Sequence, residues 1–187
     1  MEVKKYLDLT HLAENLKNST RHCQTSSGRD ESVAEHCWRI SLMAYFLKDE
    51  FPGADIDKVI KMCIFHDIGE AFTGDIPTFI KNVSDETTEE NAVNEWLDSL
   101  GEPYMTDLKE LFDEMKNQQS VEAKIFKALD KIEAVIQHNE SDISTWLELE
   151  YDLQMTYGQK ECGFSPFFKK LREQVENDTV QKIDGGA

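Results

Sequence analysis

The chain has 187 residues, and its 20 Lys and Arg stand against 37 Asp and Glu, which gives a formal charge of −17. This charge disfavours nucleic-acid polymers and anionic membranes as partners, because both are bound largely through Lys and Arg. The longest apolar run, residues 43–47, is too short to cross a bilayer, and the four cysteines lack CxxC spacing. We therefore expect a cytoplasmic protein with reduced thiols.

Apolar residues recur every three or four positions, and no segment alternates in the manner of a half-buried strand. The sequence therefore predicts an all-α fold, a single bundle of seven or eight helices in one domain that spans residues 1–187. Residues 18–31, rich in Ser and Thr, are predicted to be a loop, and residues 184–187 a frayed end. In chain order, we expect helices at about residues 2–17, 32–47, 56–72, 84–100, 104–115, 120–138, 146–157 and from 165.

Local signals support several of these helix starts. Ser32 and Glu35 have the spacing of a capping box, which predicts the start of the second helix. Residues 84–87 offer several side chains that cap helices, and we expect the fourth helix to begin there. Ser165 followed by proline is typical of an N-cap and first helical position, so it predicts the start of the last helix.

Three of the expected helices carry polar side chains on their apolar faces. His36 follows the apolar spacing of the second helix, and Asp130 that of the sixth. His66, Asp67 and Glu70 share the inward face of the third. Buried carboxylates are costly without a compensating cation, and two imidazoles with two carboxylates suit a divalent ion. The pattern predicts a metal site that retains water rather than a closed zinc site.

Three stretches carry this pattern: Glu31-Ser32-Val33-Ala34-Glu35-His36, then His66-Asp67-Ile68-Gly69-Glu70-Ala71 with Thr73-Gly74-Asp75-Ile76-Pro77, and finally Lys127-Ala128-Leu129-Asp130-Lys131. In this order they resemble the motifs of the HD-domain metal-dependent phosphohydrolases, and more closely those of the 5'-deoxynucleotidase branch. The resemblance implies a helical HD fold, with a core at about residues 7–152 and C-terminal helices at 142–180.

The resemblance also implies roles for individual residues. One divalent metal ion (Mn, Co, Mg, Fe, Ni or Zn) is expected, with four ligands: His36, His66, Asp67 and Asp130. Glu70 and Asp75 are the expected catalytic carboxylates, one to take a proton from water and one to give a proton to the leaving oxygen. Arg21, before the second helix, takes the place of the phosphate-binding arginine of the family.

The expected activity is removal of the 5'-phosphate from (deoxy)nucleoside monophosphates, by an enzyme that is expected to form a homodimer, as related nucleotidases do. Two alternatives stay open: an HD hydrolase of another nucleotide (a nucleoside triphosphate, or a cyclic or guanosine polyphosphate), and a non-catalytic metal-binding regulatory domain. The family usually carries a tryptophan soon after the arginine, where this chain has His22-Cys23-Gln24. Base preference and selection for a 2'-deoxy sugar are therefore open.

Overall fold

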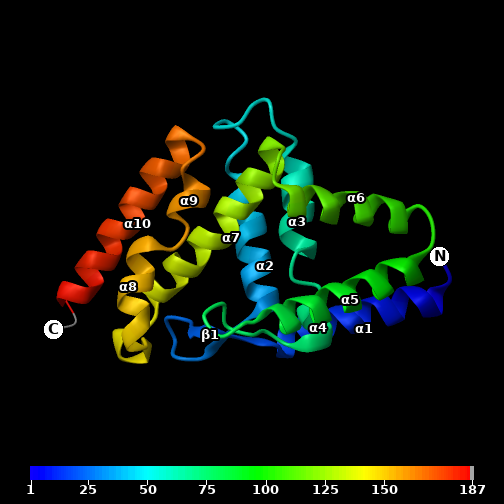
Figure 1. Ribbon diagram of the computed structural model, residues 1–187, viewed down its shortest axis with the longest axis horizontal. Coiled ribbons are helices and arrows are strands. Elements are labelled where there is room, and N and C mark those ends of the chain that lie inside the picture. The colour runs from blue at the N-terminus through cyan, green and yellow to red at the C-terminus, as the bar shows by residue number, and fades with distance from the viewer. Residues whose placement is uncertain (186–187) are drawn as a thin grey trace.

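The computed structural model describes residues 1–185 and is mainly helical (Figure 1). Eight helices in this part of the chain have nine or more residues, as the sequence predicts, and two more are single turns. In chain order the elements are α1 (Val3–Asn18), β1 (Thr20–Gln24), β2 (Asp30–Ser32), α2 (Val33–Tyr45), α3 (Ile56–Phe65), α4 (Glu70–Thr73), α5 (Val83–Leu100), α6 (Tyr104–Asn117), α7 (Val121–Glu140), η1 (Ile143–Thr145), α8 (Glu148–Thr156), α9 (Gln159–Cys162) and α10 (Pro166–Gly185).

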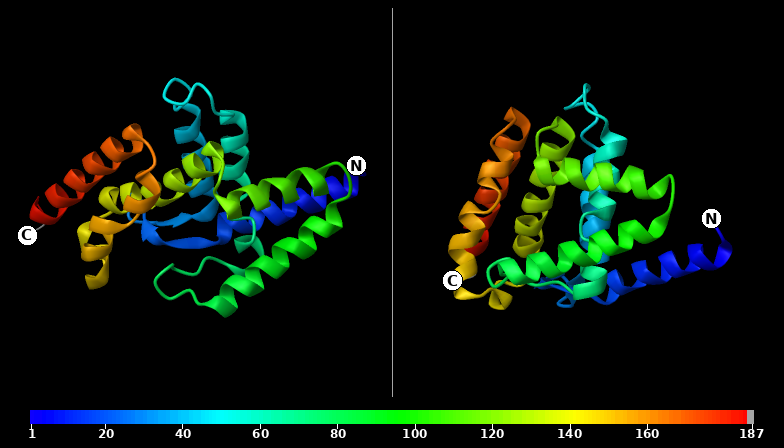
Figure 2. Two further views of the ribbon diagram at one scale, coloured as in Figure 1. Left: turned by 45° about the horizontal axis from the view of Figure 1, so that its top comes forward. Right: turned by 45° about the vertical axis from the view of Figure 1, so that its right-hand side comes forward.

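Helices α2, α3 and α7 pack on one another at the centre of the molecule. Figure 1 shows α8, α9 and α10 on one side of them, and α1, α4, α5 and α6 on the other. One apolar cluster joins the central helices to α6, α9 and α10, and a second joins α2 to α1, α4 and α5. The two further views in Figure 2 show that α5 and α1 extend outward from the centre. The central helices are thus covered on several sides and can hold buried polar groups.

The start of α2 confirms the predicted capping box. The hydroxyl of Ser32 accepts a hydrogen bond from the Glu35 N–H at 3.3 Å, and the Glu35 carboxylate accepts one from the Ser32 N–H at 2.9 Å. The apolar face of α2 is buried, and His36 lies on it with no exposed surface. Ser165 likewise caps α10, as predicted, and accepts from the Phe168 N–H. These local signals fix where the helices begin.

The predicted third helix, at residues 56–72, is interrupted at residues 66–69. α3 ends at Phe65, and α4 begins only at Glu70. Between them the backbone hydrogen bonds join residues three positions apart, instead of four as in an α-helix. The Ile68 N–H donates to the Phe65 carbonyl, and the Glu70 N–H donates to the Asp67 carbonyl. Such a tighter turn stacks side chains that are three residues apart. Asp67 and Glu70 therefore lie on one side of the turn, although no regular helix joins them.

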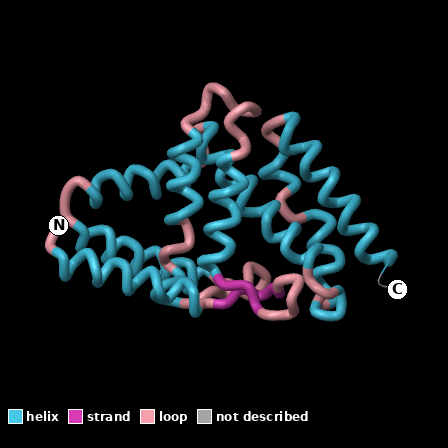
Figure 3. The backbone as a smooth tube through the Cα atoms, turned by 180° about the vertical axis from the view of Figure 1, so that it is seen from behind, coloured by secondary structure: helices cyan, strands magenta, loops and turns pink. Residues whose placement is uncertain are grey.

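The predicted loop at residues 18–31 contains a short hairpin. β1 and β2 are antiparallel, with Thr20 opposite Ser32 and Gln24 opposite Asp30. Figure 3 shows the two strands at one edge of the helical bundle. The hairpin is held there because the side chain of Gln137, on α7, donates to the Gln24 carbonyl at 2.8 Å. A tertiary contact therefore holds the hairpin in place, although its sequence does not alternate between apolar and polar residues as a half-buried strand does.

Two further boundaries differ from the predictions. The side chain of Asn82 caps α5 and accepts from the N–H groups of Ser84 and Asp85, so the helix starts slightly earlier than expected. α10 continues to Gly185, so the predicted frayed end is wrong for residues 184 and 185, and residues 186–187 lie outside the described part. Within residues 1–185, no helix has a stretch that is both long and apolar enough to span a membrane.

Candidate metal centre

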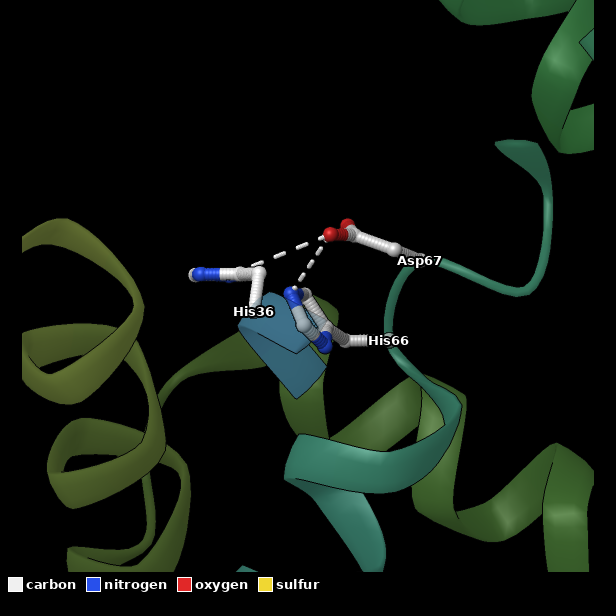
Figure 4. Close-up of side chains that lie close together, drawn as sticks. All are labelled: His36, His66 and Asp67. Atoms are coloured by element: carbon white, nitrogen blue, oxygen red, sulfur yellow. Dashed lines mark ion pairs between the residues drawn. The ribbon is translucent and has the colours of Figure 1, made fainter. Parts of the chain in front are cut away.

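Three of the four predicted ligands form a compact group. His36 comes from α2, and His66 and Asp67 from the tight turn after α3. One ligand atom from each lies within 4.8 Å of the others. Figure 4 shows the Asp67 carboxylate facing both imidazoles, and Asp67 Oδ2 lies 2.9 Å from His66 Nε2 and 3.9 Å from His36 Nε2. Helical periodicity predicted that His36 points inward. The inward direction of His66 and Asp67 is set by the turn after α3.

The fourth predicted ligand, Asp130 on α7, reaches the same place. Its Oδ1 atom lies 3.5 Å from His36 Nε2 and 3.8 Å from His66 Nε2. Burial raises the pKa of Asp130, but the neighbouring Lys127 and Lys131 outweigh it and hold this pKa well below the usual range. The structure thus brings together all four side chains named from the sequence, from three separate segments.

The imidazole nitrogens are suited to a metal ion. His66 Nδ1 donates to the Cys63 carbonyl at 3.0 Å, and a carbonyl can only accept, so Nε2 is the nitrogen that the neutral ring would offer to a metal ion. Both His36 Nε2 and His66 Nε2 are buried, and neither makes a well-aligned hydrogen bond in the described residues, although the Asp67 carboxylate lies 2.9 Å from His66 Nε2. Buried polar nitrogens normally have a partner. Two orphaned nitrogens facing two carboxylates fit a cation held among them, and this group could bind a metal.

Glu133 is a member of the site that the sequence reasoning missed. It lies on α7, three residues after Asp130, and is fully buried. Its Oε2 atom accepts a hydrogen bond from His36 Nδ1 at 2.5 Å, which leaves His36 Nε2 free to face the ligand cluster. Metal-binding histidines commonly have such a carboxylate partner, which fixes the ring and its tautomer. The spacing of three residues from Asp130 on an inward helix face is the signal that could have revealed it.

Glu70 and Asp75, the predicted catalytic carboxylates, lie next to the ligand cluster. Both line the same cavity as His66 and Asp67, and this cavity has a volume of about 440 Å³. Glu70 is 8% exposed, and its Oε2 atom has no hydrogen-bond partner in residues 1–185. Burial and the charges of Asp67 and Asp75 raise the pKa of Glu70 to about 9. In the metal-free protein Glu70 therefore holds a proton at neutral pH.

Arg21, the predicted phosphate ligand, is on β1 and lines the same cavity. Its Nε atom lies 3.3 Å from the buried Glu31 carboxylate, which orients the side chain. Burial acts against the charged guanidinium, but the carboxylates of Glu133 and Asp67 raise the pKa of Arg21 above its ordinary value. Arg21 is therefore a permanent cation in the cavity wall. The hairpin, which was not predicted, is what positions it.

Two lysines add positive charge to the wall of this cavity. Lys127 and Lys131 extend from α7, and their Nζ atoms lie 2.8 Å and 3.6 Å from Asp130 Oδ2. Lys131 also donates to the Tyr157 hydroxyl at 2.9 Å. Each lysine side chain is less than a third exposed. In a chain with a charge of −17, a cavity whose wall holds these lysines and Arg21 is suited to an anionic substrate.

The sequence model of the HD domain matches residues 13–172 of the chain. The chain belongs to the HD domain family. This match runs about 20 residues past the end of the core expected at about residues 7–152, so the HD domain includes part of the C-terminal helices.

Curated relatives of this HD domain have similar lengths. The 5'-deoxynucleotidase HDDC2 of Dictyostelium discoideum is 31% identical over 188 residues, which cover 94% of this chain and 99% of that protein. The 5'-deoxynucleotidase HDDC2 of Bos taurus is 35% identical over 166 residues, which cover 85% of this chain and 77% of that protein. The resemblance stated from the motifs is thus confirmed.

Among solved structures, a predicted metal-dependent phosphohydrolase from Magnetospirillum magnetotacticum superimposes with a TM-score of 0.78. The alignment covers 95% of this chain and 92% of that protein, at 20% sequence identity. At this level of identity the likeness shows that the two proteins share a fold. The all-α HD architecture predicted from the sequence is therefore confirmed.

Proposed function

We propose that this HD domain is a metal-dependent phosphohydrolase that removes the 5'-phosphate from (deoxy)nucleoside monophosphates. The observation that carries the proposal is the convergence of two imidazole nitrogens with two carboxylates at a cavity that also contains Arg21 and the buried Glu70. The names of the curated relatives support the same reaction and the same class of substrate.

A single divalent ion is proposed for the centre, and its identity (Mn, Co, Mg, Fe, Ni or Zn) depends on geometry and supply more than on the ligand types. The proposed ligands are the Nε2 atoms of His36 and His66 and the carboxylates of Asp67 and Asp130. When bound, such an ion acts as a Lewis acid that activates water and offsets phosphoryl charge. Glu133 keeps the His36 ring in the orientation and tautomer that ligation requires.

The remaining side chains have separate roles in the proposed reaction. Arg21 binds the phosphate oxygens, where its planar guanidinium can make two parallel hydrogen bonds. Glu70 donates its proton to the leaving 5'-oxygen, a role that suits a carboxyl group whose pKa is raised by burial. Asp75 accepts a proton from the attacking water. Burial raises the pKa of Asp75 as well, which makes it a stronger base than an exposed aspartate.

The alternatives differ in what they require of the cavity. A regulatory domain with a purely structural metal would not need a buried protonated Glu70 or a buried arginine beside it. A nucleoside triphosphate or a guanosine polyphosphate would place further negative charges in the cavity. Its wall holds Lys81 and Lys116 as well as the carboxylates of Asp75 and Glu86, so its charge does not distinguish these substrates. The choice of a monophosphate rests on the names of the curated relatives.

The test is an assay of the purified protein, loaded in turn with each divalent metal, against a panel of nucleotides. We expect release of inorganic phosphate from nucleoside 5'-monophosphates, and no such release after treatment with a chelator. Asp67→Asn, checked for folding and metal content, should lose activity by 100-fold or more, on the order of one catalytic group. Hydrolysis at the wild-type rate by this variant would refute the mechanism.

We also propose a homodimer, formed through the outer face of α2. Trp38, Leu42, Tyr45 and Phe46 follow helical spacing and are 66%, 44%, 54% and 72% exposed. The three aromatic side chains alone offer on the order of 400 Å², about half of the ~800 Å² that each partner contributes to a stable interface. The four side chains are uncharged, and the Lys48 ammonium packs over the Tyr45 ring, 4.8 Å from its centroid, so the patch carries no local excess of the negative charge of this acidic chain.

A further inference from the structure

A second cavity lies between α5 and α6, the consecutive helices on one side of the molecule (Figure 1), and we call it the α5–α6 cavity. Its volume is about 290 Å³. It is continuous with the cavity at the metal centre, because the two share five side chains: His66, Lys81, Glu86, Phe112 and Lys116. Glu90, Asn94 and Asp113 also line it and are exposed, so it reaches the surface. The metal centre is thus connected to solvent by a path between these two helices.

His66 stands at the inner end of this path. Its side chain is 7% exposed, and it lines both cavities. Its Nε2 atom, which is proposed to bind the metal ion, makes no well-aligned hydrogen bond within residues 1–185. Of the four proposed ligands, His66 alone is among the described residues that line the α5–α6 cavity. A cation that arrives between α5 and α6 therefore meets His66 first.

The charge of the α5–α6 cavity favours cations. Four carboxylates line it, against two lysines. Two of the carboxylates, Glu89 and Glu90, are paired with these lysines at 2.5 Å. The other two, Glu86 and Asp113, are exposed and have no ion-pair partner in the part of the chain that the structure describes. Unpaired carboxylates at an opening raise the local concentration of cations there.

The part of the larger cavity that is proposed to bind phosphate is less suited to an arriving cation. Arg21, Lys127 and Lys131 line that cavity and are not among the residues around the α5–α6 cavity. Their positive charges attract a phosphate group and repel a divalent ion.

The α5–α6 cavity is also wide enough for a hydrated ion. An ion with about six waters needs roughly 180 Å³, at ~30 Å³ for each water. Val93, Leu97 and Phe112 form an apolar part of the wall, which offers no ligand that would retain the ion before it reaches His66.

We propose that the α5–α6 cavity is the path by which the divalent ion enters and leaves the metal centre. Glu86 and Asp113 draw the hydrated ion to the opening, and His66 is the first ligand on the path. This inference rests on the metal centre of the proposed function. Because Arg21 does not line the path, a phosphate bound to Arg21 leaves it free.

A bulky side chain in the path tests the proposal, because entry and exit along one path cross the same barrier. Asn94 is exposed on α5 and lines the α5–α6 cavity. Asn94→Trp should slow both association and dissociation of Mn²⁺ at least about threefold and leave the dissociation constant unchanged. Association is followed by stopped-flow mixing of the full-length protein with Mn²⁺, and dissociation by transfer of bound Mn²⁺ to an excess of fluorescent chelator. Asn91→Trp, the same change on the same helix but outside both cavities, is the matched control and should keep the wild-type rates.

The charges at the opening are tested separately. Glu86→Gln combined with Asp113→Asn should lower the association rate of Mn²⁺ about 3- to 10-fold at low ionic strength. This difference should shrink in high salt, because exposed charges are then screened. Asp152→Asn combined with Glu173→Gln removes the same charge from exposed positions on α8 and α10 and should leave the rate within about twofold of the wild-type value.

The possible outcomes separate the path from the metal centre itself. Wild-type rates in a folded Asn94→Trp protein would overturn the path alone. So would a weaker affinity with an unchanged association rate, which would show that α5 shapes the metal centre without conducting the ion. If Asn94→Trp does not fold, the double charge variant decides, and a wild-type association rate at low salt would overturn the path. A wild-type protein that binds no divalent ion would instead refute the proposed function, and the path with it.

Discussion

Replacement of Glu133 by glutamine tests whether this buried carboxylate controls the metal ligand His36. Glu133 Oε2 lies 2.5 Å from His36 Nδ1, and neither side chain has any exposed surface. Its other oxygen is without a hydrogen-bond partner, and the nearest cation, Arg39, is 3.7 Å away. Glu133 is therefore committed to His36. Glutamine keeps the volume of the side chain but replaces a charged acceptor by a neutral amide, in a hydrogen bond about half as strong.

The expected effect is a loss of metal affinity. Loss of such a partner of a metal-binding histidine typically weakens metal binding by ~10- to 100-fold. That range corresponds to about 1.4–2.7 kcal/mol. We expect the change in binding free energy to be near the upper limit, because the pair is fully buried and no water can replace the carboxylate.

Metal affinity can be measured directly, by competition with a fluorescent chelator and independently of catalysis. Glu140→Gln is the matched control: Glu140 pairs with Arg39 at 2.7 Å but is about half exposed and does not contact His36. Its affinity for metal should stay within about twofold of the wild-type value, in keeping with the small contribution of surface ion pairs. A folded Glu133→Gln protein that binds metal as tightly as the wild type would show that Glu133 does not position a ligand.

Three further outcomes are expected. Arg21→Lys should raise KM for a nucleoside monophosphate about tenfold in steady-state assays, because lysine cannot make the paired hydrogen bonds of a guanidinium. An unchanged KM would show that Arg21 does not bind the phosphate. In the metal-free protein the Glu70 carboxyl group keeps its proton up to about pH 9, whereas in the unfolded chain it loses this proton near pH 4.5. Between these two pH values the folded state binds more protons than the unfolded state, so the free energy of unfolding falls as pH rises. Urea denaturation of Glu70→Gln from pH 5 to 9 should show a smaller fall, and equal slopes would contradict the raised pKa. Trp38→Glu should give a monomer in light scattering if the face of α2 forms the dimer, while a dimer that persists would exclude that face.

The helices and the direction of the ligands could be predicted from the sequence because they depend on local pattern. His36 and Asp130 repeat with the apolar residues of their helices, so their inward direction follows from the helical period alone. The start of α2 depends on two side chains three residues apart. These signals are contained within a few turns of chain, and the structure confirms each of them.

The features that were missed depend on contacts between distant segments. Residues 66–69 (His, Asp, Ile and Gly) are weak helix formers, but the helical spacing of inward side chains continues across them to Glu70, and this spacing does not reveal the change to shorter-range backbone bonds. The hairpin that carries Arg21 is held by Gln137, more than 100 residues away. Glu133 had the right spacing, but a glutamate on a helix is usually exposed, and only the packed structure shows that it is not.

The close packing of α5 against the turn after α3 couples the chemistry of the site to a remote helix. A β-carbon at Gly69, the residue before Glu70, would lie 2.6 Å from the Glu89 side chain and 3.0 Å from that of Val93. Lys81 is bound to the same Glu89 and lines the cavity at the metal centre. Any enlargement at position 69 would therefore demand a compensating reduction on α5. Across related sequences, these positions should covary as a unit, and grafting the ligand motif onto another HD scaffold should succeed only when the matching stretch of α5 is transferred with it.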